Sequence, residues 1–141
     1  MIEFQTDSVE MPLIDEGRIC RWLDAVAVSY GRRLGNLCYR FCSDDVILRV
    51  NREFLHHDYY TDIITFDYTK GNRVGGDLLI SLETVASNAE LLGVAYDREL
   101  LRVIVHGLLH LCGEHDKLPG EREKMEAAEN RALAVYDEMG D

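Results

Sequence analysis

The sequence predicts an α+β fold in which a single small mixed β-sheet of about four strands is covered by about five helices. Short runs rich in β-branched and aromatic residues, which are typical of strands, are interspersed with longer segments whose apolar residues recur at helical spacing. The two kinds of segment do not follow the steady alternation of a doubly wound fold. A length of 141 residues with 47% hydrophobic content suits one core, so residues 1–141 are expected to form a single domain.

The N-terminal part of the chain is expected to contain two strands and two helices. Ile2–Thr6 is a short β-rich run, and Pro12 begins an amphipathic helix that extends to about Leu34. Apolar and polar residues alternate over 37–42, which predicts a strand with one buried face. The Ser43-Asp44 pair can cap the helix that follows.

The middle of the chain is expected to contain the other two strands. His56–Tyr60 is polar and is predicted to be a loop. Thr61–Phe66 and Gly75–Ser81 are β-rich runs, and the residues Lys70–Asn72 between them form a predicted turn.

Three helices are expected to complete the fold. Ser81 or Thr84 can begin the first of them, and Gly93 can end it. The segment 99–112 is apolar on nearly every side, which predicts a buried helix. The segment 121–139 is predicted to be an amphipathic helix with an acidic face.

The buried helix carries a pattern that is typical of a metal site. His106 and His110 are four residues apart, so on a helix they lie one turn apart on the same face. Gly113 can adopt the left-handed conformation that ends a helix and turns the chain back. Asp116, three residues later, is then the predicted third ligand. Three protein ligands leave a further position for water, as in catalytic zinc sites.

Alternatives to this interpretation stay open. His115 is the second candidate for the third ligand, because imidazole is the commoner zinc ligand. A carboxylate ligand would extend the choice of metal from zinc toward manganese or nickel. The two helical histidines can also be ordinary residues of a helix, although burying imidazoles without partners is costly. Gly107 occupies the position of the general base in His-Glu-x-x-His enzymes, which disfavours peptidase chemistry.

The charge of the chain restricts where a polyanion can bind. The formal net charge is −11, which is unusual for a nucleic-acid-binding protein. Basic residues outnumber acidic ones only over 32–73, in the set Arg32, Arg33, Arg40, Arg49, Arg52, Lys70 and Arg73. This stretch is either a polyanion-binding surface or an ordinary surface of mixed charge.

Polar residues within this stretch are further candidates for the site. Arg52 lies late in a predicted helix, where it can point at a ligand held by the sheet and the buried helix, or simply into solvent. His56 and His57 lie in the polar loop without a ligand-like spacing partner and are predicted to face solvent.

The cysteines and the N-terminal residues indicate a reducing compartment. Cys20, Cys38, Cys42 and Cys112 form no C-x-x-C pair, so neither a zinc ribbon nor a redox motif is indicated. The N-terminus lacks the basic flank and apolar run of a signal peptide, and no segment has the length and apolarity of a membrane span. The protein is therefore expected to be cytoplasmic without membrane association, and Cys38 and Cys42, in a predicted strand, are expected to be reduced structural thiols.

Four short segments together resemble a known family. Val50–Phe54, Thr61–Phe66, Gly76–Ser81 and His106–Gly113 occur in the order and spacing of the bacterial YbeY endoribonucleases, and the match runs from about Val46 to the end of the chain. The resemblance implies a metal-dependent single-strand endoribonuclease that matures ribosomal RNA, notably the 3′ end of the small-subunit RNA, and takes part in ribosome quality control. Zinc is the metal that it implies.

The resemblance assigns roles residue by residue. His106 and His110 match the first two metal ligands of the family, and Arg52 matches its functional arginine. The family pattern Gly-x-Asp-His is here Gly113-Glu-His-Asp116, which places Asp at the third ligand position. The family pattern Ser-Phe-Pro is here Thr65-Phe-Asp67, which alters the expected rim of the pocket.

These roles imply a mechanism and a set of partners. Water or the RNA 2′-hydroxyl, activated at one zinc or other divalent ion, is expected to attack the phosphodiester while Arg52 stabilises the phosphate. The expected partners are ribosomal RNA and the small ribosomal subunit, with a small-subunit ribosomal protein and an assembly GTPase as further candidates.

Two other functions compete with this one. The chain can be a non-catalytic ribosome-assembly factor with a structural metal, which its acidic charge favours. It can also be a metallohydrolase of peptides or amides, for which Asp77 is the spare carboxylate.

Overall fold

The computed structural model of the chain describes residues 1–54 and 61–140. Its strands are β1 (Ile2–Thr6), β2 (Arg33–Cys42), β3 (Ile63–Asp67) and β4 (Arg73–Ser81). Its helices are α1 (Glu16–Ser29), α2 (Asp44–Phe54), α3 (Leu82–Leu92), α4 (Tyr96–Leu111) and α5 (Glu121–Glu138). Within these residues the strands form one mixed sheet, so the predicted α+β class is confirmed.

The sheet has the strand order β1-β2-β4-β3. β1 runs parallel to β2, and β2 runs parallel to β4. β3 runs antiparallel to β4, and the predicted turn between these two strands is closed by a bridge between Lys70 and Arg73. This order brings β3 to the edge of the sheet, where it packs against α4 together with β4.

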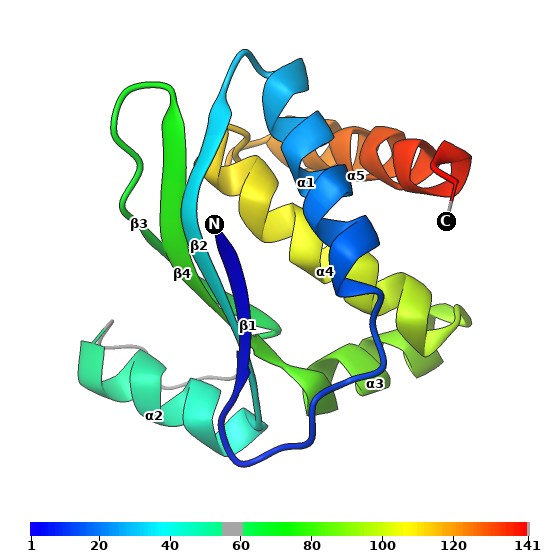
Figure 1. Cartoon of the computed structure of the whole chain (residues 1–141). Helices are drawn as coiled ribbons and strands as arrows, with labels where there is room; N and C mark the ends of the chain where they lie inside the picture. Colours follow the sequence, from blue (N-terminus) through cyan, green and yellow to red (C-terminus); the bar gives the residue numbers. More distant parts are fainter. Residues whose placement is uncertain (55–60, 141) are drawn as a thin grey trace.

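Helices cover the two faces of the sheet unequally (Figure 1). Helices α1, α4 and α5 lie on one side and enclose the larger core, to which β2 contributes Leu37, Tyr39 and Phe41. Helix α2 lies on the other side and covers a smaller apolar cluster around Ile47 and Ile64. The alternation along β2 therefore does bury one face, as its sequence predicts.

The predicted helix over 12–34 was wrong at both ends. The Oδ1 of Asp15 accepts a hydrogen bond from the backbone N–H of Arg18 at 3.1 Å, so the helix begins after this cap rather than at Pro12. At the other end, the Arg33 N–H donates to the carbonyl of Asn72 at 2.8 Å. Pairing with the neighbouring strand, which the sequence does not reveal, converts the end of the expected helix into the start of β2.

The other helix boundaries agree better with the sequence. The Ser81 hydroxyl caps α3 by accepting from the Thr84 N–H at 3.2 Å, and Gly93 follows the last residue of this helix. Helix α4 begins at Tyr96, three residues before its expected start. The buried character of α4 is confirmed, because Val105, Leu108 and Leu109 are completely inaccessible to solvent.

Three further expectations concern the cysteines, the membrane and the loop. The four cysteines are free thiols. Over the described ranges, no helix has the length and apolarity needed to cross a membrane. The predicted loop His56–Tyr60, with His56 and His57, lies outside the described residues.

Candidate metal centre

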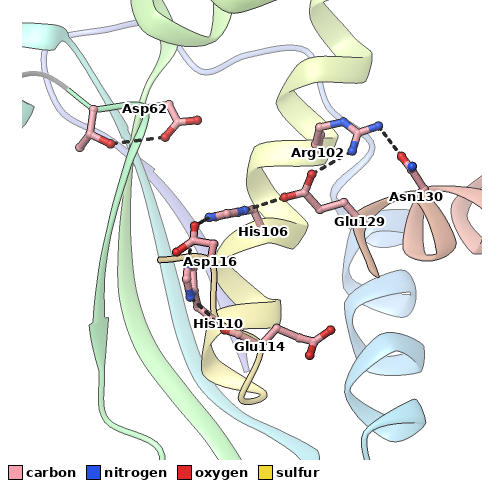
Figure 2. A network of polar contacts seen from close by, with 9 residues as sticks. Asp62, Arg102, His106, His110, Glu114, Asp116, Glu129 and Asn130 are labelled. Carbon is pink, nitrogen blue, oxygen red and sulfur yellow. Dashed lines mark hydrogen bonds and ion pairs between the residues drawn. The ribbon is translucent and has the colours of Figure 1, made fainter. Parts of the chain in front are cut away.

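Three side chains converge beside the C-terminal half of α4 (Figure 2). The Nε2 atoms of His106 and His110 lie 3.4 Å and 3.3 Å from the Oδ2 of Asp116. One donor atom from each of the three residues lies within 4.8 Å of the other two. Because two imidazole nitrogens and a carboxylate oxygen meet at one point, this group can hold a metal ion.

The turn after α4 brings Asp116 to the two histidines. Gly113 has a φ of +106°, a conformation that residues with a side chain rarely adopt. The N–H groups of Gly113 and Glu114 donate to the carbonyls of His110 and Leu109 at 3.1 Å and 3.0 Å, which closes the end of the helix. The predicted reversal of the chain at Gly113 is therefore present.

Among the described residues, His115 lies outside the converging group. Its side chain is exposed and lines the wall of the adjacent cavity. Asp116, rather than His115, is thus the side chain that converges with the two histidines, and its role as third ligand stays a prediction.

Both imidazoles are held by their other ring nitrogen. The Nδ1 of His106 lies 2.6 Å from the Oε2 of Glu129, and the Nδ1 of His110 lies 3.1 Å from the backbone carbonyl of Glu114. A carboxylate and a carbonyl only accept hydrogen bonds, so both Nδ1 atoms carry a proton, and in the neutral imidazoles the Nε2 atoms are the ones left to bind a metal. This is the tautomer that binds a metal through Nε2, so the donor set fits a divalent cation of the zinc type.

The charges around the two histidines differ. Burial disfavours the charged form of His106, but the hydrogen-bonded carboxylate of Glu129, together with the charges of Asp62 and Asp116, outweighs it and raises the pKa of this imidazole. Burial lowers the pKa of His110, and the neighbouring His106 lowers it further. Burial acts to raise the pKa of Glu129, but hydrogen bonds from His106 and Arg102 dominate and lower it. Glu129 is therefore an ionised carboxylate behind His106.

The converging group lies where two cavities meet. One cavity of about 750 Å³ extends between β3, α4 and the segment 115–118. A second cavity of about 760 Å³ extends from the same point between α4 and α5 toward Arg98 and Arg122. Both cavities are lined by Asp62, His106, Asp116 and Lys117. A ligand bound at the group can thus extend in two directions.

Comparison with known proteins identifies the family. A family model described as Endoribonuclease YbeY matches residues 3–137. The chain belongs to the YbeY endoribonuclease family. A YbeY endoribonuclease of Phocaeicola vulgatus is 62% identical over 135 residues, which cover 96% of this chain and 98% of the relative. One of Bacteroides thetaiotaomicron is 60% identical and covers 95% of this chain and 98% of the relative. The family resemblance seen in the sequence is thus confirmed.

A solved structure agrees with the fold of this YbeY family member. The solution structure of a protein from Thermotoga maritima superposes with a TM-score of 0.64 at 20% sequence identity. The match covers 97% of this chain and 92% of the other. At this identity the comparison supports the arrangement of helices and strands and does not bear on the site.

Arg52, for which the sequence resemblance predicts a functional role, lies in the last turn of α2. Its side chain is exposed, and the described lining of the first cavity contains its buried neighbour Asn51 rather than Arg52 itself. The structure therefore places α2 at the cavity without bringing Arg52 into the converging group. The role of Arg52 stays a prediction.

The acidic residues Asp67 and Asp77 line different cavities. Asp67, at the position of the proline in the YbeY pattern, lines the first cavity and accepts a hydrogen bond from the Thr69 N–H at 2.8 Å. Asp77 instead lines a separate cavity of about 330 Å³ with Cys38 and Leu79. In the described part of the chain, Asp77 is thus not among the residues around His106, which argues against it as a base for peptide hydrolysis.

Sequence reasoning missed two acidic residues of this YbeY site. Asp62, opposite His106 in Figure 2, is half-buried, and burial raises the pKa of its carboxyl group. Glu129 is charged but only 8% exposed, whereas the other buried residues of its helix are small or apolar, such as Ala128 and Leu133. A charged residue on the apolar face of a helix needs a partner, and this signal in the sequence points to Glu129.

Proposed function

We propose that this protein is a single-domain, metal-dependent endoribonuclease that cleaves single-stranded RNA in the maturation of ribosomal RNA, notably at the small-subunit 3′ end, and in ribosome quality control. The observation that carries the proposal is the convergence of two Nε2 atoms and one carboxylate where two cavities meet. Membership of the YbeY endoribonuclease family supplies RNA as the class of substrate.

Zinc is the proposed cofactor. Two imidazole nitrogens and one carboxylate oxygen are the donor set of several catalytic zinc sites, although such a set also accepts other divalent ions. A divalent ion bound here would act as a Lewis acid and lower the pKa of a bound water toward neutrality. His106, His110 and Asp116 would hold it, with the two imidazoles oriented by Glu129 and by the Glu114 carbonyl.

The two cavities support cleavage within a chain rather than at its end. A phosphodiester at the converging group would have room for nucleotides on both sides, in the cavity toward β3 and in the cavity toward Arg122. Lys117 lines both cavities and carries a positive charge next to Asp116. It is therefore placed to contact the phosphate backbone near the cleaved bond.

Arg52 is the proposed stabiliser of negative charge on the phosphate. Its planar guanidinium can donate two parallel hydrogen bonds to the non-bridging oxygens, which gain charge in the transition state. Support comes from its place in the turn of α2 that also supplies Asn51 to the cavity. The nucleophile is either water or the RNA 2′-hydroxyl.

The proposed partners follow from an RNA-processing role. They are ribosomal RNA and the small ribosomal subunit, with a small-subunit ribosomal protein and an assembly GTPase as further partners. The proposed location is the cytoplasm, where this RNA is matured.

One observation favours a second function, that of an assembly factor in which the metal only stabilises the turn after α4. The first cavity is lined by Asp62, Asp67 and Glu121 besides Asp116, against the single cation Lys117 among its described residues. This charge, with a net charge of −11 for the chain, suits a protein partner better than free RNA.

Cleavage of a small-subunit RNA precursor with its 3′ extension separates the two functions. Untagged protein is assayed after chelation and again after zinc is returned, with Asp116→Ala as a matched inactive control. Cleavage at a defined site that disappears on chelation and returns with zinc supports the nuclease. Zinc binding without cleavage, both on free RNA and on small-subunit particles, supports the assembly factor instead.

A further inference from the structure

We propose that Glu129, clamped by Arg102, is a positioning residue that orients His106 and thereby sets the metal affinity of the site. This inference rests on the metal site proposed above. It concerns a group that does not touch the ion or the substrate and lies on a different helix from the two histidines.

Glu129 uses both of its carboxylate oxygens. Its Oε2 lies 2.6 Å from the Nδ1 of His106, and its Oε1 lies 2.8 Å from the Nη1 of Arg102. Arg102 is itself held, because its Nη2 donates to the Oδ1 of Asn130 at 2.8 Å (Figure 2). A carboxylate fixed at both oxygens cannot rotate away from the imidazole, so it determines the plane of the His106 ring.

The two partners of Glu129 share one face of α4. Arg102 and His106 are four residues apart on that helix, so both point toward α5. The register of α5 is fixed by the buried side chains of Met125 and Leu133, which are 2% and 1% exposed. Packing of α5 in the core therefore places a buried charge behind one metal ligand.

The support of the two imidazoles is unequal. The Nδ1 of His106 faces an ionised carboxylate at 2.6 Å, whereas the Nδ1 of His110 faces the neutral carbonyl of Glu114 at 3.1 Å. A charged acceptor at Nδ1 makes the Nε2 of the imidazole a stronger electron-pair donor to a metal ion, and it holds the ring more firmly in place. His106 is thus the better-supported ligand.

The substitution Glu129→Gln tests this role with almost no change of shape. The single amide oxygen of the glutamine can accept a hydrogen bond from either His106 or Arg102, and the NH₂ group of the glutamine must then face the other donor. Loss of such a supporting partner typically lowers metal affinity about 10–100-fold. The matched control is Glu123→Gln, which removes the same charge from an exposed position on the same helix.

The measurement is the equilibrium affinity for zinc, obtained by competition with a chromogenic chelator, together with the unfolding temperature of each metal-free variant. We expect Glu129→Gln to bind zinc about 10–100-fold more weakly than the unsubstituted protein, and Glu123→Gln to bind it equally well. In metal-free protein, the His106 Nδ1–H proton resonance should be protected from exchange and should lose that protection in Glu129→Gln.

Three outcomes are distinguishable. If the unsubstituted protein binds no zinc, the proposed metal site fails, and the present inference falls with it. If Glu129→Gln lowers the unfolding temperature but leaves zinc affinity unchanged, Glu129 only stabilises the fold and the inference is overturned. If Glu129→Gln does not fold, Arg102→Lys decides: a severalfold loss of zinc affinity supports the clamp, and unchanged affinity overturns it.

Discussion

Gly107 of α4 lies directly against Leu78 of β4. A Cβ at position 107 would collide with the leucine side chain and lie 2.9 Å from the Cδ1 of Ile63. The residue after His106 is therefore glycine because the helix touches the sheet there. A glutamate at this position, which supplies the general base in zinc peptidases, would require Leu78 and Ile63 to move.

The substitution Gly107→Ala should destabilise the protein by about 1–3 kcal/mol, because the added methyl overpacks a close helix–sheet contact. Chemical denaturation of the metal-free protein measures this loss. Gly140→Ala is the control, since a Cβ there would meet no atom within 4 Å. Equal stability of the two variants would show that repacking of Leu78 and Ile63, with the gain in helix propensity, offsets the overpacking.

The third metal ligand can be assigned by replacing each of its two candidates, Asp116 and His115, with alanine. Asp116→Ala should lower zinc affinity by at least about 100-fold, because loss of a direct ligand exceeds loss of a supporting partner. His115→Ala should bind zinc as before, since His115 stands outside the converging group of described residues. The opposite pair of results would make His115 the ligand.

Arg52→Lys should reduce RNA cleavage while leaving zinc affinity unchanged. Lysine keeps the positive charge but cannot form the planar two-bond contact with phosphate. Arg52→Ala should cost about 10²-fold in the rate constant for cleavage, as for other groups that stabilise transition-state charge. Single-turnover cleavage measures both, and full activity of Arg52→Lys would remove this residue from the mechanism.

Acidification should release the metal. A ligand imidazole must be neutral to bind zinc, and the pKa of His106 in the metal-free protein is raised above its ordinary value of 6.5. Protons therefore begin to compete at a higher pH than for an unperturbed histidine, and affinity falls as the pH falls through this range. Chelator competition at a series of pH values checks this, and an affinity independent of pH between about 8 and 6 would contradict it.

Reversal of charge at Lys117 should weaken RNA binding. Lys117→Glu is expected to lower affinity for single-stranded RNA and to reduce the slope of log affinity against log salt by about 1, because one phosphate contact is lost. Lys124→Glu, an exposed substitution on α5 outside the described cavity linings, is the control. If both variants bind RNA with the same affinity, the RNA backbone does not pass Lys117.

The sequence was most informative where local rules act. The spacing of His106 and His110 and the left-handed glycine after them are properties of one helix and its end, so they can be read without knowledge of the fold. The Ser81 cap and the buried face of β2 are local in the same sense.

Tertiary partners explain what the sequence did not reveal. The start of β2 at Arg33 depends on pairing with Asn72, and the role of Glu129 depends on a helix that begins 15 residues after His106. Neither relation has a fixed spacing. The exposed position of Arg52 on α2 likewise follows from how that helix crosses the sheet.

The three donors of the metal centre differ in how they are attached to the protein. Two are on α4, in the core, whereas Asp116 belongs to the segment 112–120, which has no regular secondary structure and is largely exposed. Capture of an ion would therefore add a second attachment, at Asp116, between this segment and the helix without changing the helix itself. A protease should cut the segment more slowly when the ion is present, so limited digestion would report occupancy of the centre without any RNA.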